Sequence, residues 1–258
     1  MLSELNLFTT FFLLLIAFLY GIVIGSFLNV CIYRIPKKEN IATERSHCMS
    51  CGTQLKWYDL IPLFSWLFLR GKCRYCKAKI SVQYPLVEFA NGIGYVWIFV
   101  VNGFNFISIL YCLCVSALLA LSIIDLRTFE IPVSFYIFIL ILGVVRAVYD
   151  YENILTYLIG MVSVSGFLLL CYIVTKGRGI GGGDIKLMAA AGLLLGWQNI
   201  IVALFAGCII GSVIHITLMI VSKKDRMLAF GPYLSIGIFI AMMYGKPLID
   251  WYIGLIVG

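Results

Sequence analysis

Residues 181–186 read Gly181-Gly182-Gly183-Asp184-Ile185-Lys186, which places a carboxylate and three glycines at the start of an apolar segment. The surrounding chain of 258 residues is 62% hydrophobic and only 12% charged. Because an ionisable side chain at membrane depth is costly, an aspartate in this setting is a candidate functional residue. A second aspartate, Asp125, follows the apolar stretch 121–124. Two such carboxylates in one membrane protein favour a shared acid–base site.

Apolar segments of about 20 residues recur along the chain, which is the length that a helix needs to cross a bilayer. The mean hydropathy of +1.04 excludes an ordinary soluble domain. The segment 184–196 is short for a span, and a short helix is tolerated in a membrane where it lines a protein or water cavity. We predict an all-α polytopic membrane protein with about eight transmembrane helices. They are expected near residues 8–33, 83–101, 104–124, 131–149, 154–174, 184–196, 199–221 and 228–245.

The two ends of the chain are also apolar. The first segment follows one acidic residue, Glu4, and lacks the basic start of a cleaved signal, so we interpret it as a retained span. The tail 247–258 is too short to cross a membrane. It either lies at the membrane interface or extends the last span.

The basic residues predict the orientation. If the spans alternate from the loop 34–82, one side holds every Lys and Arg except Arg146 and Lys246, that is 17 of 19. The positive-inside rule makes that side cytoplasmic, with the N-terminus outside. The net charge of +7 then reflects topology and contact with anionic lipid, and we expect no nucleic-acid partner. The same assignment places Asp125 and Asp184 on the cytoplasmic side.

The polar loop 34–82 contains two Cys-x-x-Cys motifs, Cys48 with Cys51 and Cys73 with Cys76, separated by 21 residues. A loop of this size is too small to form a large hydrophobic core and needs a disulfide or a metal ion to stabilise its fold. The spacing is typical of a structural zinc site with four thiolate ligands, which leaves no open position for a substrate. A pair of disulfides is the alternative, and a reducing cytoplasmic side disfavours it.

The two aspartates lie at opposite kinds of helix terminus. Asp125 lies where one predicted helix ends, since Pro132 marks the start of the next. Asp184 lies where a helix begins, and the glycines before it let another backbone approach closely. Two neighbouring carboxylates share a proton, and such a pair can polarise a water and protonate a leaving amine in peptide hydrolysis. The alternatives are an interfacial charge paired with Arg127 for Asp125, and an N-cap for Asp184.

Other charged residues near this face have weaker claims. Lys186 either keeps Asp184 ionised or anchors the span at the headgroups. Glu130 is within reach of the same face. Asp150 and Asp250 map near the outer face without a glycine run, so we assign them no role.

In this order, the motifs resemble those of the type IV prepilin peptidase family from about residue 20 to 230. The matching motifs are Gly25–Val30, Tyr33–Pro36, Arg45–Cys48, Cys73-x-x-Cys76, Ile80-Ser81, Tyr84–Glu88, Asp125–Pro132 and Gly181-x-Gly183-Asp184-x-Lys186-Leu187.

The resemblance implies an intramembrane aspartyl protease of the GxGD type, with Asp125 and Asp184 as the catalytic pair. We expect Gly181, Gly183 and Lys186 to form the loop that an extended substrate strand approaches. The family cleaves prepilins and pseudopilins at the cytoplasmic face of the bacterial inner membrane, after a Gly that ends a short basic leader. Many members then methylate the new N-terminal residue, commonly Phe, with S-adenosylmethionine.

The residues themselves do not predict the methyltransferase, because no glycine-rich nucleotide loop follows a strand pattern. The candidates for that site are Glu88, Arg34 and Arg45. A carboxylate at position 88, where loop and span meet, can bind a cationic amino terminus. The alternative for Glu88 is an interfacial residue paired with Lys or Arg.

We predict three parts: a first transmembrane helix at 1–33, a cytoplasmic zinc-binding loop domain at 34–82 associated with methyl transfer, and a membrane-embedded peptidase core at 83–258. A peptidase without methyltransferase activity is one alternative. A proton-coupled transporter is another, since paired intramembrane aspartates relay protons. A scaffold whose zinc loop docks a partner is a third. The sequence does not predict the oligomeric state.

Overall fold

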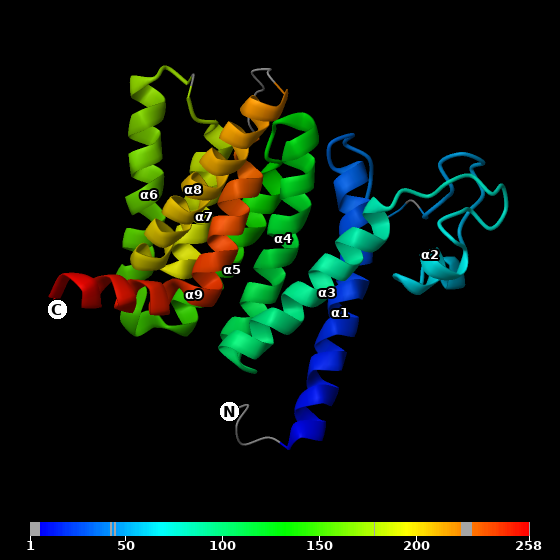
Figure 1. Ribbon diagram of the computed structural model, residues 1–258, viewed down its shortest axis with the longest axis horizontal. Coiled ribbons are helices and arrows are strands. Elements are labelled where there is room, and N and C mark those ends of the chain that lie inside the picture. The colour runs from blue at the N-terminus through cyan, green and yellow to red at the C-terminus, as the bar shows by residue number, and fades with distance from the viewer. Residues whose placement is uncertain (1–5, 42, 44, 178, 223–228, 258) are drawn as a thin grey trace. The chain divides into compact units, whose positions relative to one another are not determined.

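The computed structural model describes residues 6–41, 43, 45–177, 179–222 and 229–257 (Figure 1). Within these ranges the regular structure is helical, with two isolated β-bridges, His47 with Gln54 and Lys72 with Lys79. The start of the predicted last span at residue 228 lies outside the described residues. So do four of the basic residues used to predict orientation, which are Arg178, Lys223, Lys224 and Arg226.

Among the described residues, eight helices correspond to the eight predicted segments. Six of them are long and apolar enough to cross a membrane, α5 is a shorter apolar helix, and α7 has only 14 residues. This confirms the predicted all-α polytopic membrane fold, including the short helix. The helices are α1 (Leu7–Arg34), α3 (Gln83–Asn102), α4 (Phe106–Thr128), α5 (Val133–Tyr149), α6 (Ile154–Val174), α7 (Gly182–Leu195), α8 (Trp197–Ser222) and α9 (Gly231–Val257).

Short elements lie between the long helices. The loop after α1 contains η2 (Trp57–Asp59) and α2 (Phe64–Phe68), and η3 (Tyr151–Asn153) links α5 to α6. Pro132, in an extended conformation, precedes α5 as predicted. Gly196 ends α7 with a φ of +81°, a value that a side chain disfavours.

The apolar tail extends the last helix, since α9 continues to Val257 with Pro247 inside it. In Figure 1 the red end of α9 turns away from its orange beginning. A proline within a helix removes one backbone hydrogen bond and clashes with the carbonyl four residues earlier, which accounts for such a bend.

Residues 1–120 form one compact unit, in which α1 packs closely against α3. A Cβ on Gly21 would lie 2.7 Å from Gly92 Cα, and one on Gly25 would lie 2.7 Å from Glu88 Cα. Asn91 Nδ2 donates to Gly21 O at 2.7 Å across the same contact. Small residues that bring helix backbones together are the usual basis of helix packing in membranes.

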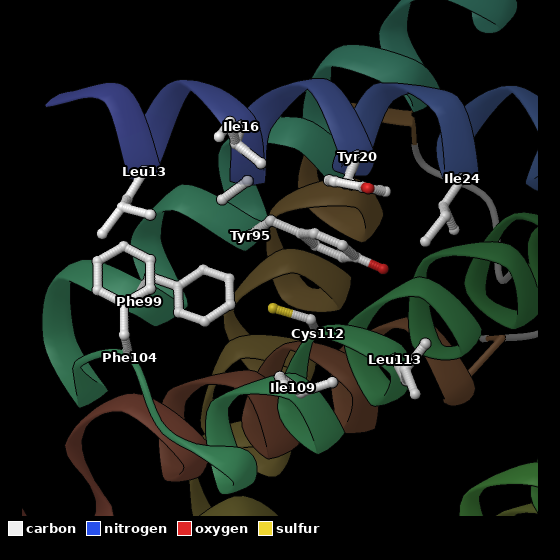
Figure 2. Close-up of a pocket in the computed structure, with 11 residues that line it drawn as sticks. Leu13, Ile16, Tyr20, Ile24, Tyr95, Phe99, Phe104, Ile109, Cys112 and Leu113 are labelled. Carbon is white, nitrogen blue, oxygen red and sulfur yellow. The ribbon is translucent and has the colours of Figure 1, made fainter. Parts of the chain in front are cut away.

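The same unit contains an apolar cavity of about 350 Å³ (Figure 2). Leu13, Ile16 and Tyr20 of α1 face Tyr95 of α3 and Cys112 of α4 around it. We assign this cavity no function.

Residues 121–258 form the second unit, which is organised around α7. Nine of the 14 residues of α7 are buried, because α5, α6, α8 and α9 all contact it. Gly160 of α6 and Gly192 of α7 meet backbone to backbone, and a Cβ on either would collide with the carbonyl oxygen of the other. A helix enclosed in this way need not span the full bilayer, since protein rather than lipid surrounds its ends.

Candidate active site and metal centre

Asp125 lies in the last turn of α4 and is only 4% exposed. Its Oδ2 atom accepts a hydrogen bond of 2.9 Å from the backbone N–H of Gly231, the first residue of α9. The N-terminus of a helix favours a negative charge because its first N–H groups have no partner within the helix. The position of Asp125 at a helix end is therefore as predicted, and a second helix supplies its donor.

Asp184 is the third residue of α7 and is 8% exposed. Its Oδ2 atom accepts a hydrogen bond of 3.3 Å from the backbone N–H of Gly181, which is itself the N-cap. Asp184 is therefore not the N-cap, but its side chain accepts from the N-cap N–H group, which is the acidic half of a capping box. Capping engages one carboxylate oxygen and leaves the other for a second role.

The two aspartates line the same cavity, which has a volume of about 480 Å³ and lies within the unit 121–258. Each carboxylate faces the N-terminus of a helix, α9 for Asp125 and α7 for Asp184. The cavity is lined by Asp125, Phe129, Glu130, Ile131, Val133, Tyr136, Gly181, Gly182, Gly183, Asp184, Lys186, Ala229 and Phe230.

The predicted approach loop lies on this cavity. Gly181 is extended, with φ of −76° and ψ of 142°, and a Cβ on Gly183 would lie 3.1 Å from Ile131 Cβ. The Lys186 ammonium stands 5.4 Å from the centre of the Tyr136 ring, in a cation–π contact. A carboxylate pair in a partly polar cavity can hold a water and exchange protons with it.

One part of the cavity was missed by sequence reasoning. Ala229, Phe230 and Gly231 come from the segment that leads into α9, and no motif pointed to them. The dipeptide Gly231-Pro232 just before an apolar segment was an available signal, because proline is favoured in the first turn of a helix.

The four cysteines of the two Cys-x-x-Cys motifs come together in the loop after α1. The Sγ atoms of Cys48, Cys51, Cys73 and Cys76 all lie within 4.8 Å of one another. Cys48 and Cys76 are 3.8 Å apart at sulfur, which equals the edge of about 3.8 Å expected for a tetrahedron with Zn–S bonds of about 2.3 Å. All nine cysteines are free thiols. The cluster therefore fits a four-coordinate metal such as zinc.

Local hydrogen bonds shape both halves of this cluster. The side chain and backbone of Thr53 lower the pKa of Cys51 to about 6. Arg74 Nε lies 2.6 Å from Asp59 Oδ1, and the Tyr75 hydroxyl donates to Asp59 Oδ2 at 3.3 Å. Asp59 thus fixes the turn between Cys73 and Cys76.

Glycines and a histidine complete the loop. Gly52, after Cys51, and Gly71, before Cys73, have φ of +68° and +66°, a region that favours glycine, and Lys77 adopts the same region directly after Cys76 with φ of +60°. His47 is exposed, and its Nδ1 atom lies 3.3 Å from Arg45 O, outside the four-thiol cluster.

The three methyltransferase candidates lie in different settings. Glu88 is 6% exposed and accepts a hydrogen bond of 2.8 Å from the backbone N–H of Leu63. Arg34 is buried and donates to Asn40 O at 3.0 Å, whereas Arg45 is exposed. None of the three lines either of the two cavities described above.

Both halves of the chain match models of known protein families. Residues 19–102 match the model of the bacterial peptidase A24 N-terminal domain, and residues 112–216 match that of the type IV leader peptidase family. The two matches cover the loop with the four cysteines and the segment with both aspartates.

Several curated relatives align over nearly the whole chain. A prepilin leader peptidase/N-methyltransferase of Xanthomonas campestris is 34% identical over 272 residues, covering 90% of this chain and 92% of the relative. One of Bacillus subtilis is 32% identical, covering 95% of this chain and 100% of the relative. No solved structure matches the chain. The family matches and these relatives show that the chain belongs to the type IV leader peptidase family.

Proposed function

We propose that this protein is a prepilin leader peptidase that works as an aspartyl endopeptidase, with Asp125 and Asp184 as its catalytic pair. It would remove the basic leader of prepilins and pseudopilins after a Gly, at the cytoplasmic face of the bacterial inner membrane. The observation that carries the proposal is the placement of both carboxylates on one cavity, each at the N-terminus of a helix. The names of the relatives supply the substrate class.

In the proposed reaction a water molecule lies between the two carboxylates. One carboxylate takes a proton from the water while the water oxygen attacks the scissile carbonyl carbon. The other gives its proton to the nitrogen of the leaving amine as the C–N bond breaks. The pair keeps one proton throughout, so the next cycle begins with the roles reversed. The N–H groups of Gly231 and Gly181 hold the carboxylates in place.

We also propose that the protein methylates the new amino terminus, as the name of its relatives implies. S-adenosylmethionine would supply the methyl group, and the loop with the four-thiol cluster is the region assigned to this step. Zinc bound by the four cysteines would be structural, since four thiolates close its coordination shell. Glu88, Arg34 and Arg45 remain the candidate residues for methyl transfer, and Glu88 contacts the loop from α3, since it accepts a hydrogen bond from the backbone N–H of Leu63.

The decisive test compares the purified wild type with Asp125→Asn and Asp184→Asn on a prepilin-like substrate in detergent. Each variant should lower the cleavage rate by about a hundredfold or more, because a positioned acid or base contributes on that scale. The control is Asp250→Asn, because Asp250 is exposed near the C-terminal end of α9. This variant should cleave the substrate at the wild-type rate. Zinc content and thermal stability report whether each variant is folded.

The product mass in the same assay reports the second activity. With S-adenosylmethionine present, the wild type should add the mass of one methyl group to the new N-terminus. An unmodified product would favour a peptidase without methyl transfer. Normal cleavage by either aspartate variant would disprove the paired mechanism and bring the transporter or scaffold interpretation forward.

A further inference from the structure

The loop that carries the four cysteines also presents an apolar surface. In the η2–α2 segment (residues 57–68), Trp57 is 78% exposed, Phe64 52%, Leu67 66% and Phe68 83%. Side chains of this size gathered on one short segment mark an interaction site when they are not part of a core.

The opposite side of the same segment is held firmly in place. Trp66 Nε1 donates to Ile80 O at 3.3 Å, and a Cβ on Gly71 would lie 2.8 Å from the Trp66 ring. Trp66 therefore packs toward the second Cys-x-x-Cys turn, while Phe64, Leu67 and Phe68 face outward. The outward-facing side chains of Phe64, Leu67 and Phe68 therefore form a surface with a defined conformation.

A hydrogen bond sets the depth of this surface along α3. The backbone N–H of Leu63, just before α2, donates to Glu88 Oε2 at 2.8 Å. Glu88 is the sixth residue of α3, so it lies about 7–8 Å along the helix axis from Gln83 at a rise of about 1.5 Å per residue. The segment thus returns to the depth of a membrane-spanning helix.

The neighbouring surfaces agree in polarity and charge. Leu86 and Phe89, on either side of Glu88, are 61% and 50% exposed on a helix that is apolar enough to cross the bilayer. The segment is flanked by exposed cationic side chains at Lys56, Arg70 and Lys72. Aromatic and aliphatic groups with adjacent Lys and Arg are the composition of an element that lies in the interface of an anionic membrane.

We propose that the η2–α2 segment inserts its apolar side chains into the headgroup–acyl boundary of the bilayer beside α3. The depth given by the Leu63–Glu88 hydrogen bond, about one and a half helical turns, matches the roughly 5–10 Å to which such elements enter a membrane. The four-thiol cluster is then fixed at the membrane surface, not suspended in the cytoplasm. This inference depends on the membrane fold and not on the proposed catalysis.

Photocrosslinking of the full chain in lipid nanodiscs tests the proposal. A benzophenone amino acid is placed at Phe68 in protein reconstituted with phosphatidylethanolamine and phosphatidylglycerol, and the adducts are identified by mass spectrometry. Phe12, 53% exposed on α1, is the lipid-facing reference, and the exposed Gln54 beside the first Cys-x-x-Cys motif is the reference for water. Lipid adducts at position 68 should approach the yield at position 12 and exceed that at position 54 several-fold.

Three outcomes would overturn the proposal. They are a lipid yield at position 68 no higher than at position 54, adducts to a second copy of the chain, and adducts only to an added prepilin-like peptide. Zinc content shows whether the loop has folded in each labelled protein. The same probe at Leu67 provides an independent position if the Phe68 protein loses zinc.

Discussion

At the scale of single residues, Gly231 positions the carboxylate of Asp125. Its N–H group binds Asp125, and a Cβ at this position would lie 2.7 Å from Asp125 Oδ2. Any side chain here must displace either the carboxylate or the start of α9. A glycine that no catalytic motif includes is therefore required by close contact.

We predict that Gly231→Ala lowers the cleavage rate by about 10- to 100-fold, because small displacements of a catalytic group are costly. Gly254→Ala, in the same helix, is the matched control, since a Cβ there meets nothing within 4 Å. The measurement is kcat/KM on a prepilin-like peptide, with thermal stability as the folding check. Equal activity in the two variants would show that the contact does not position Asp125.

At the scale of elements, the hairpin between α5 and α6 is closed by Asp150. Its carboxylate accepts hydrogen bonds from the Tyr157 hydroxyl at 2.5 Å and from Asn153 Nδ2 at 3.0 Å, and Arg146 Nη2 lies 3.5 Å away. Tyr157, then Asn153, and the charge of Arg146 hold the pKa of Asp150 below its usual range. No motif in the sequence marks this residue.

The depressed pKa predicts how the hairpin responds to pH. A carboxyl group whose pKa is lower in the folded state stabilises the protein above its unfolded pKa of about 4 and loses that effect as pH falls through the folded value. Asp150→Asn should therefore lower the melting temperature by a few degrees at pH 7. The difference from wild type should shrink below about pH 4. A difference that stayed constant into acid would show that the charge is unimportant.

At the scale of the whole molecule, the four-thiol cluster gives the loop between α1 and α3 a fixed structure. Cys51→Ser should strip most of the roughly one zinc expected per chain and lower the protein yield, because the loop has no large core to replace the metal. Cys208→Ser changes a cysteine on α8, outside the cluster, and should keep its zinc. Metal analysis of both purified variants decides the matter. Full zinc in Cys51→Ser would count against the site.

Much of this architecture could be predicted because it depends on local patterns. Hydropathy placed the long helices, and motif spacing placed the four cysteines that the structure brings together. What could not be predicted depends on backbone groups meeting across long separations. Gly231 N–H reaches Asp125, 106 residues away, and Leu63 N–H reaches Glu88, 25 residues away. Every residue but proline has an N–H group, so the sequence does not mark the one that is used. The orientation in the membrane stays a prediction.

The bond from Gly231 to Asp125 has a consequence for how this site should be dissected. A scan that truncates side chains one by one around the cavity cannot remove a peptide N–H, so this donor would escape detection. Replacing the amide at residue 231 by an ester, through incorporation of glycolic acid, deletes the donor while adding no bulk. The hydrogen-bond donor that holds Asp125 thus belongs to the main chain, and only a backbone substitution can remove it.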